Sequence, residues 1–352
     1  MQAEAASRER RRLDLLWRRG RAFLGCDTAI MGGAMTWVSE RNLVAAISNA
    51  GGFGIIACGA MGPAQLDAEI VATYDRTDRP FGVNLITLHP DLMALIAVCA
   101  ARRVGHVVLA GGLPTAQAVA RIKDAGARVI CFAPALAIAK KLVRMGADAL
   151  VIEGMEAGGH IGPVATGVLA QEILPHVTEV PVFVAGGIGR GEAILAYLEM
   201  GAAGVQLGTR FVAAHESIAH PRFKQAFIRA GARDAVPSPQ LDPRFPVIPV
   251  RALVNEGMQE FMVLQRGVID RFNRGELAQK EAQLEIEHFW AGALRRAVID
   301  GDIERGSLMA GQSVGMVTRT QSTREIIAEL VGQAAEALAR REAPFLPYEA
   351  EA

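Results

Sequence analysis

The 352-residue chain lacks net charge, long apolar runs and any surplus of cysteine. Its 37 basic and 37 acidic residues balance, so there is no basic excess to attract nucleic acid and we expect no such partner. Hydrophobic residues make up 51% of the chain, but no run approaches the ~20 residues that span a bilayer, so we expect no membrane segment. The four cysteines show no C-x-x-C pairing and lie in or beside apolar segments, which predicts reduced core thiols in a cytoplasmic protein.

Several signature motifs are also missing. There is no P-loop, no G-x-S-x-G nucleophile elbow and no H-E-x-x-H zinc motif. His215 and His220 have no third ligand of an obvious type nearby, so we expect no metal site. No G-x-G-x-x-G opens a βαβ unit, so NAD(P)H, if it is used, must bind transiently rather than in a Rossmann domain.

From Thr28 to about Ala214, short apolar runs alternate with helical patterns, which is typical of parallel βαβ units. Several of the helical segments end at glycine, as helices with a left-handed cap do. Eight units that close on themselves predict a TIM (β/α)8 barrel, with an open doubly wound sheet as the alternative. The expected strands lie at residues 29–31, 54–57, 81–85, 106–109, 128–132, 149–152, 182–184 and 204–207.

The flanking segments have other patterns. Residues 8–21 are rich in arginine but also contain acids, which fits an amphipathic helix that caps the barrel better than a transit peptide. After Ala214, the proline-dense residues 236–249 indicate a crossing or linker, and helical patterns at 256–274 and 276–298 indicate a lid. A last helix is expected at 323–341. We therefore expect a barrel with its N-terminal helix at 1–213, a mostly helical lid at 214–313 and a segment at 314–352 that packs back on the barrel.

One glycine-dense stretch dominates the barrel region: Ala149-Leu-Val-Ile-Glu153-Gly-Met-Glu-Ala-Gly-Gly-His160-Ile-Gly162. Four apolar residues predict a buried strand that ends at Glu153, and the turn after it has too few side chains to pack alone. Its glycines allow the backbone to approach a planar or phosphorylated ligand closely. His160 is the one group in the turn that exchanges protons near neutral pH. A hydrogen-bonded loop histidine is the alternative, which the glycines around it disfavour.

Two further glycine turns, Ala185-Gly186-Gly187-Ile188 and Gly208-Thr209-Arg210-Phe211, follow the seventh and eighth predicted strands. In TIM barrels, the loops after these strands commonly bind phosphate through backbone N–H groups and a helix N-terminus. A single Gly-Gly can be an ordinary tight turn, but two such turns in consecutive units favour a phosphate site. The groups at the strand ends include one histidine but no obvious nucleophile and no set of metal ligands. Such a site suits a bound cofactor that supplies the chemistry.

Seven segments together resemble the nitronate monooxygenase (2-nitropropane dioxygenase) family and its near relatives, the FMN-dependent enoyl-acyl-carrier-protein reductases. The resemblance extends from Leu16 to Leu338. One departure is Gly32-Gly33-Ala34-Met35, where many relatives have Gln-Gly-Gly-Met, so a contact by that glutamine cannot be assumed. The matching segments are Gly33-Ala-Met-Thr-Trp-Val-Ser39, Asn49-Ala-Gly-Gly-Phe-Gly54, Pro80-Phe-Gly-Val-Asn84, residues 153–162, Ala185-Gly-Gly-Ile188, Val205-Gln-Leu-Gly-Thr-Arg-Phe211 and Gly306-Ser-Leu-Met-Ala-Gly-Gln312.

The resemblance implies a TIM barrel that holds FMN, with His160 as the catalytic histidine over the flavin ring. Met35 would contact the isoalloxazine, and the loops at 186–187 and 208–209 would hold the phosphate. Ser307, Gly311 and Gln312 are expected at the substrate or the flavin edge. The cofactor contacts that the resemblance implies are Gly33, Ala34, Met35, Asn84, Glu153, Gly158, Gly159, Gly186, Gly187, Gln206, Gly208 and Thr209.

These motifs fit more than one activity. The leading expectation is a nitronate monooxygenase, which oxidises alkyl nitronates or nitroalkanes with O2 to carbonyl compounds and nitrite. The alternatives are an NAD(P)H-dependent enoyl-acyl-carrier-protein reductase and an NAD(P)H:quinone-type flavin reductase. A barrel that binds a phosphate ligand without redox chemistry is the alternative from another class. The expected partners are a small-molecule substrate, FMN and, transiently, NAD(P)H, and a homodimer is left open as the assembly.

Overall fold

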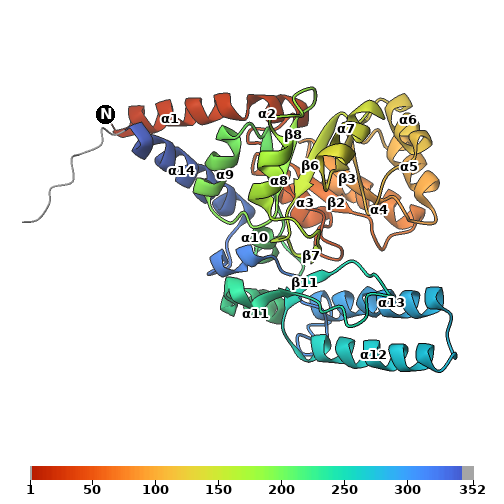
Figure 1. Cartoon of the computed structure of the whole chain (residues 1–352). Helices are drawn as coiled ribbons and strands as arrows, with labels where there is room; N and C mark the ends of the chain where they lie inside the picture. The colour runs from red at the N-terminus through yellow and green to blue at the C-terminus, as the bar shows by residue number, and fades with distance from the viewer. Residues whose placement is uncertain (1, 343–352) are drawn as a thin grey trace, which may run out of the picture.

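The computed structural model describes residues 2–342, and its largest sheet has eight parallel strands (Figure 1). The strands are β1 Ile30–Gly32, β2 Gly54–Ala57, β3 Phe81–Ile86, β4 His106–Ala110, β5 Arg128–Phe132, β6 Ala149–Glu153, β8 Val182–Ala185 and β9 Gly204–Leu207. Their order in the sheet is β1-β9-β8-β6-β5-β4-β3-β2. The two ends also meet, because the Gly32 N–H donates to the Phe53 carbonyl and the Phe53 N–H to the Ile30 carbonyl, both at 2.9 Å. The fold is therefore a TIM (β/α)8 barrel, as predicted.

The strands are continuous apolar runs because protein covers both of their faces. In β6, the four residues 149–152 are each 0% exposed. All eight predicted strands are confirmed, and their ends differ from the predictions by at most one residue. The periodicity that marks a half-exposed strand is absent here, so glycine boundaries and run length identified these strands.

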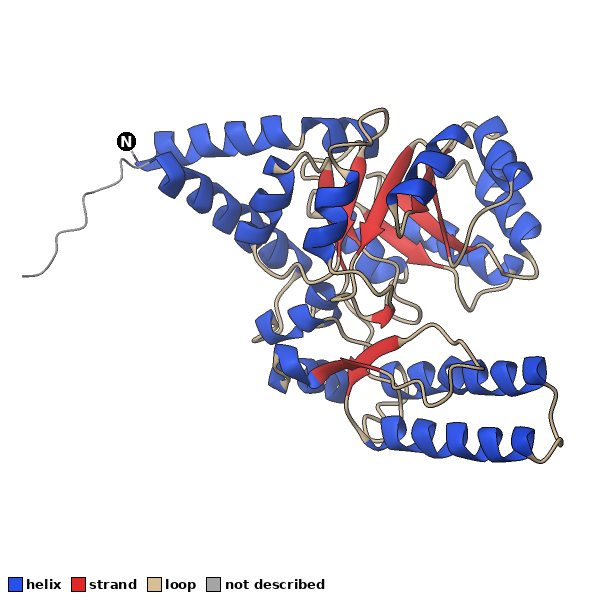
Figure 2. Ribbon diagram, viewed as in Figure 1, coloured by secondary structure: helices blue, strands red, loops and turns tan. Residues whose placement is uncertain are grey.

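Helices alternate with the strands and cover the outside of the barrel (Figure 2). The helical patterns predicted between the strands are confirmed. In α4, Pro63 occupies the first turn, where its missing N–H costs nothing. The helices are α3 Arg41–Asn49, α4 Pro63–Tyr74, α5 Leu92–Ala101, α6 Ala116–Asp124, α7 Leu136–Arg144, α8 Thr166–Ile173, α9 Gly191–Glu199 and α10 Thr209–Val212.

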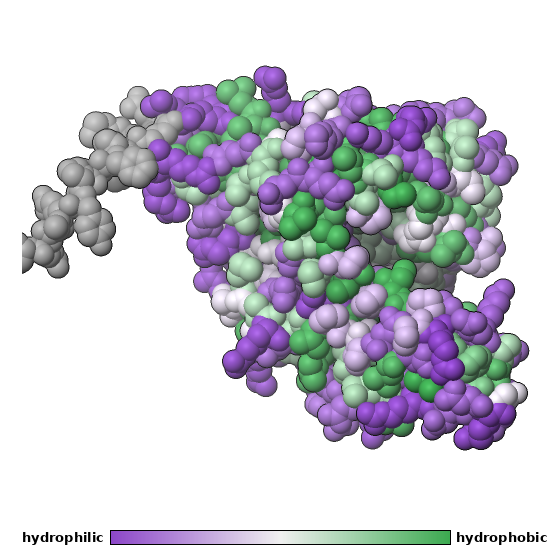
Figure 3. Space-filling view, viewed as in Figure 1, coloured by the Kyte–Doolittle hydropathy of each residue, from purple (hydrophilic) through white to green (hydrophobic). Residues whose placement is uncertain are grey.

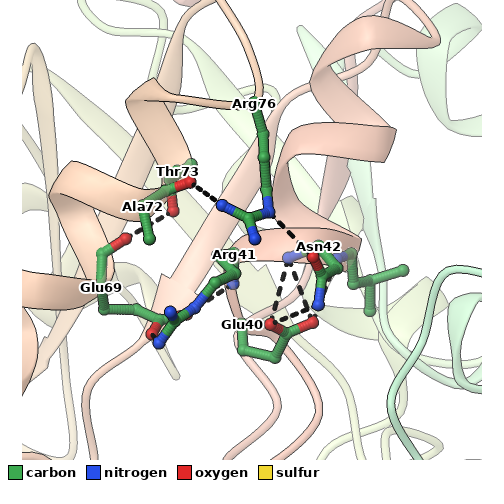
Figure 4. Close-up of polar contacts among 8 residues, drawn as sticks. Glu40, Arg41, Asn42, Glu69, Ala72, Thr73 and Arg76 are labelled. Carbon is green, nitrogen blue, oxygen red and sulfur yellow. Dashed lines mark hydrogen bonds and ion pairs between the residues drawn. The ribbon is translucent and has the colours of Figure 1, made fainter.

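Polar contacts fix the start of α3 against α4 (Figure 4). The Glu40 carboxylate accepts from the N–H groups of Asn42 (3.1 Å) and Leu43 (3.4 Å), which have no partner within the helix. The buried Glu69 of α4 accepts hydrogen bonds from the Arg41 N–H at 2.5 Å and from the Arg41 guanidinium. These contacts hold in place the loop that leads from β1 to α3.

The two terminal helices pack on the barrel and on each other (Figure 1). α1 (Gln2–Leu16) leads into α2 (Arg18–Leu24), and both Leu13 and Trp17 are fully buried. α14 (Thr323–Glu342) lies against α9, where the Gly191 N–H donates to the Gln333 side chain at 2.9 Å. The predicted N-terminal and C-terminal helices are thus confirmed. Among the described residues, no helix has the length and apolar character needed to cross a membrane.

The four cysteines, Cys26, Cys58, Cys99 and Cys131, are free thiols in this structure. Burial raises the pKa of each to about 12. Since the thiolate is the reactive form, these side chains act as inert packing residues, in agreement with the prediction of core thiols.

The segment predicted to form a lid contains a hairpin of two long helices, α12 (Glu256–Asn273) and α13 (Gln279–Val298), on the side of the mouth of the barrel (Figures 1 and 2). It has a separate core that includes Phe245, Phe261 and Trp290. Both predicted lid helices are confirmed. A shorter helix, α11 (Pro221–Arg229), precedes the hairpin within this segment.

A three-stranded antiparallel sheet joins the lid to the barrel, and the sequence pattern did not indicate it. Its strands are β10 (Ala235–Pro237), β11 (Val250–Leu253) and β7 (Gly159–His160), with β11 in the middle. β10 and β11 border the proline-dense stretch that was predicted to be a linker, and β7 lies in the predicted turn. Because β7 comes from the barrel and β11 from the lid, the backbone at His160 belongs to both parts.

Candidate active site at the barrel mouth

The loop after β1 places residues 33–35 at the carboxyl end of the barrel strands. The Ser39 hydroxyl donates to the Gly33 carbonyl at 2.9 Å and accepts from the Met35 N–H at 3.0 Å, which fixes the loop. A Cβ built on Gly33 would lie 3.5 Å from the Gln206 side chain. The loop therefore lies directly beside β9, and two of the predicted cofactor segments meet here.

The loops after β8 and β9 present bare backbone at the mouth. Gly186 and Gly187 have φ values of +97° and +68°, which residues other than glycine rarely adopt. Within the described chain, the N–H groups of Gly187 and Gly208 donate to no protein acceptor. A Cβ on Gly208 would lie 3.3 Å from the Met35 sulfur, so Met35 lies close to this loop. Two backbone donors without protein partners, at neighbouring strand ends, fit a phosphate group.

Two amide side chains lie in the strands below the mouth. Asn84 on β3 and Gln206 on β9 are each 6% exposed. The Oδ1 atom of Asn84 has no hydrogen-bond partner among the described residues. A buried acceptor left unpaired costs about 1–3 kcal/mol, and a ligand N–H that meets it removes this cost. A flavin ring carries such an N–H, so this acceptor fits the cofactor that the sequence predicted.

Glu153, the last residue of β6, is half-buried at the same end of the barrel. Its neighbour across the sheet is the apolar Ala185, and burial raises the pKa of the carboxyl to about 7. Near neutral pH, Glu153 is therefore divided between its protonated and ionised forms. The sequence predicted a cofactor contact here, and the structure adds a group that can exchange protons at neutral pH.

His160 lies in strand β7 rather than in a free turn. Its backbone pairs with Val250 of β11, and the next N–H, of Ile161, donates to the Pro249 carbonyl at 3.0 Å. The side chain is exposed. Just before it, a Cβ on Gly158 would lie 2.6 Å from the Gly311 nitrogen, so this glycine permits a close backbone contact. The lid strand thus sets the position of the predicted catalytic histidine.

The segment after the lid returns to the mouth. The Gly311 N–H donates to the Thr209 hydroxyl at 3.0 Å, and the Gln312 N–H donates to the Glu156 carbonyl at 2.9 Å. Gly311 and Gln312 therefore bridge the β9 loop and the turn that carries His160. The Thr209 oxygen is used as an acceptor, which leaves its O–H available to donate to an anion.

Ser307, the third predicted substrate residue, contacts the lid instead. Its N–H donates to the Ala293 carbonyl of α13 at 2.9 Å, and the residue is 2% exposed. Among the described residues, its hydroxyl has no hydrogen-bond partner. The structure places Ser307 at the base of the α12–α13 hairpin, and none of its hydrogen bonds among the described residues reaches the β8 or β9 loops.

Two charged residues support the site although the sequence did not point to them. The Glu156 carboxylate accepts from the N–H (2.9 Å) and the hydroxyl (2.8 Å) of Thr166 and so caps the start of α8. Arg210, 3% exposed, donates to the Met316 carbonyl at 2.6 Å and pairs with Glu329 of α14 at 3.1 Å. These partners are 10 to 119 residues apart in sequence, so no local pattern reveals them. The one available signal in the sequence was that Glu156 is a second carboxylate, after Glu153, in the glycine-dense stretch.

The molecular surface recedes between the barrel mouth and the lid (Figure 3). Backbone phosphate donors, a buried amide acceptor and two proton-exchanging groups at the mouth of a TIM barrel are typical of flavin-dependent oxidoreductases. Similarity to known proteins makes the assignment specific. The chain belongs to the nitronate monooxygenase family, whose model matches residues 21–99 and 92–333.

Relatives with different activities resemble the chain over most of its length. FabK from Thermotoga maritima is 35% identical, with a TM-score of 0.82 over 92% of this chain and 97% of that protein. A (3aS,4S,5R,7aS)-5-hydroxy-7a-methyl-1-oxo-octahydro-1H-indene-4-carboxyl-CoA dehydrogenase from Mycobacterium tuberculosis is 32% identical over 337 residues, 88% of this chain and 93% of that protein. The nitroalkane oxidase of Streptomyces ansochromogenes is 27% identical, with a TM-score of 0.73 over 90% and 98% of the two chains. The chain is thus a flavin-dependent oxidoreductase of this family.

Proposed function

We propose that the enzyme uses FMN to reduce the carbon–carbon double bond of an enoyl thioester, with NAD(P)H as the electron donor. One observation carries this proposal: the chain is similar, lid included, to 97% of FabK, an enoyl-acyl-carrier-protein reductase, at 35% identity. The CoA dehydrogenase, at 32% identity, also takes its name from an acyl thioester. An acyl thioester is therefore the substrate class that two of the relatives share.

The site has groups suited to FMN. Gly187 and Gly208 offer backbone N–H donors for one phosphate, Asn84 offers a buried acceptor for a ring N–H, and Met35 lies close to the phosphate loop. A single phosphate site supports FMN rather than a dinucleotide. FMN bound there would supply hydride transfer between NAD(P)H and the substrate.

The protein's part in the reaction is to position the substrate and supply a proton. Reduction of an enoyl thioester places a hydride on the β-carbon and a proton on the α-carbon. We assign that proton to His160 in its charged form, which lies at the mouth on β7 and regains a proton from water. Glu153, whose pKa burial raises to about 7, is a second group at the same end of the barrel that can exchange a proton.

Oxidation of nitroalkanes or nitronates with O2 is the second candidate, and it was the leading expectation from the sequence. The match to the family model and the similarity to nitroalkane oxidase favour it. In this reaction His160 would act as a base on a neutral nitroalkane, and a pre-formed nitronate would need no base.

Anaerobic reduction and reoxidation of the bound flavin separate the two candidates. The purified enzyme is mixed in turn with NADH, NADPH and propyl nitronate, and the visible flavin absorbance is followed. Our proposal predicts that one of the nicotinamides bleaches the flavin and that crotonyl-CoA or a crotonyl-pantetheine thioester restores the colour. Rapid bleaching by propyl nitronate, with no reoxidation by either thioester, would instead support the second candidate.

A further inference from the structure

Arg251 is a charged residue in the interior of the protein, where an unpaired charge is strongly unfavourable. It is the second residue of β11, the middle strand of the small sheet, and is 3% exposed. A guanidinium removed from water must be hydrogen-bonded to be tolerated. Two of its donors meet carbonyls: Nε donates to Met155 at 2.9 Å and Nη1 donates to Ala235 at 2.5 Å.

These two bonds join segments that are distant in sequence. Met155 lies in the turn after β6 of the barrel, and Ala235 begins β10. Arg251 itself belongs to the strand that continues into the lid, and its backbone pairs with Gly159 of β7. The sheet lies between the barrel and the lid in Figure 1. One side chain therefore ties the turn of the active site to the base of the lid.

The turn is held at both ends by this single strand. At its start, the Met155 carbonyl is fixed by the Arg251 guanidinium, and at its end Gly159 and His160 pair with Arg251 and Val250. The planar guanidinium suits this role because its donors point in fixed directions, whereas a lysine ammonium acts as a single point. Between the two ends lie only Glu156, Ala157 and Gly158.

We propose that Arg251 is a positioning residue, which fixes the turn from Met155 to His160 and thereby sets the place of His160 at the barrel mouth. The catalytic part of this inference rests on the proposed function, in which His160 transfers the proton. The part of the inference that concerns the position of the turn does not depend on the proposed function. A displacement of a reacting group by about 1 Å can cost ~10²-fold in rate.

The test compares Arg251→Met and Arg251→Lys with a matched control, Arg271→Met. Arg271 also carries a guanidinium in the lid region, but it pairs with Glu285 within the α12–α13 hairpin at 2.9 Å, and among the described residues it has no hydrogen bond to the turn. Hydrogen exchange of residues 154–162, flavin occupancy, kcat and KM are measured for each variant. Exchange needs no substrate, so it tests the position of the turn even if the proposed reaction is wrong.

We expect Arg251→Met to keep its flavin, to speed exchange of residues 154–162 by roughly tenfold and to lower kcat ~10²-fold with little change in KM. Arg251→Lys should lie between this variant and the wild type, and Arg271→Met should leave the exchange of the turn unchanged. Wild-type exchange and kcat in a folded, flavin-bound Arg251→Met enzyme would overturn the proposal. So would failure of both Arg251 variants to fold, since Arg251 would then be a general folding determinant. Faster exchange in an enzyme that reduces no enoyl thioester would keep the positional role and reject the proposed function.

Discussion

His160 distinguishes the candidate reactions at the level of one residue, because they use it differently. His160→Asn keeps a polar side chain but removes proton transfer near neutral pH. We expect turnover of an enoyl thioester, or of a neutral nitroalkane, to fall by ~10²- to 10⁴-fold, while turnover of a pre-formed nitronate changes little. The measurement is kcat for each substrate at equal flavin occupancy. Wild-type rates on all three substrates would reduce His160 to a structural part of β7.

His106, at the opposite end of the barrel, makes stability depend on pH. It is 7% exposed, its Nε2 lies 2.9 Å from the Phe23 carbonyl, and its ring packs against Phe53 at 5.0 Å between centroids. Burial lowers its pKa from 6.5 to about 4. Between these two values the unfolded chain binds a proton and the folded chain does not, so stability falls as the pH falls.

The free energy of unfolding should therefore drop by about 3 kcal/mol between pH 7 and pH 4 on account of this residue alone. Urea unfolding at a series of pH values measures the drop, and His106→Gln should flatten it. His176→Gln serves as the control, since His176 is exposed and its loss should leave the pH dependence unchanged. An identical pH profile for His106→Gln and the wild type would reject the assignment.

At the level of elements, the β8 and β9 loops carry the binding of the cofactor phosphate. Gly208 is the better of the two glycines to change, because a side chain at Gly187 would strain a backbone with φ +68° and also meet Glu156 at 3.0 Å. At Gly208 the φ is −108°, and the nearest contact of a Cβ would be the flexible Met35 side chain at 3.3 Å. A substitution at Gly208 thus affects the ligand more than the fold.

Gly208→Val should fold normally and bind FMN much more weakly, by at least ~10-fold, because the new side chain fills the space where the backbone N–H meets the phosphate. FMN titration into apoprotein, followed by fluorescence quenching, gives the dissociation constant. Gly332→Ala, on α14, is the control, since no neighbouring atom lies within 4 Å of a Cβ at that position and no cofactor contact was predicted there. Equal FMN affinity in both variants and the wild type would remove the β9 loop from the phosphate site.

The barrel elements were predictable and the small sheet was not, for physical reasons. Each barrel strand is a short, mostly apolar run between two helical patterns, and several of the strands lead directly into glycine, so local sequence suffices. β7 has only two residues, which is too short for a hydrophobic periodicity to be seen. β11 contains the buried Arg251 at a position where a buried strand normally has an apolar residue. Both exist because of pairing between residues about ninety positions apart, such as His160 with Val250. Contacts of this kind are invisible to a reading of local pattern.

The candidate site was likewise predictable from the sequence only in part. The glycine turns and His160 were found because their residue types are unusual for their positions. Glu156 and Arg251 were missed, since the residues beside them in the sequence do not indicate the more distant partners that hold their side chains. The roles predicted for the cofactor residues remain predictions that the variants above test.

At the level of the whole molecule, most of the α12–α13 hairpin packs in a hydrophobic core separate from that of the barrel, and one small sheet joins the two parts. We propose that residues 214–313 act as a lid that moves relative to the barrel. The amides of α12 and α13 should exchange faster than those of β6 and β8, and should gain protection when a substrate analogue binds. Hydrogen exchange with and without a saturated acyl-CoA measures this. Equal protection in both parts, with no response to the ligand, would make the lid a fixed extension.

The central claim is that the barrel mouth holds one FMN, bound by backbone groups at the ends of β8 and β9. The most direct test is to purify the protein, denature it, and identify and quantify the released chromophore by chromatography and mass spectrometry. The account predicts a yellow protein that releases FMN at about one molecule per chain, or an apoprotein that takes up FMN to that ratio. A colourless protein that releases no flavin and cannot be reconstituted with FMN would contradict it.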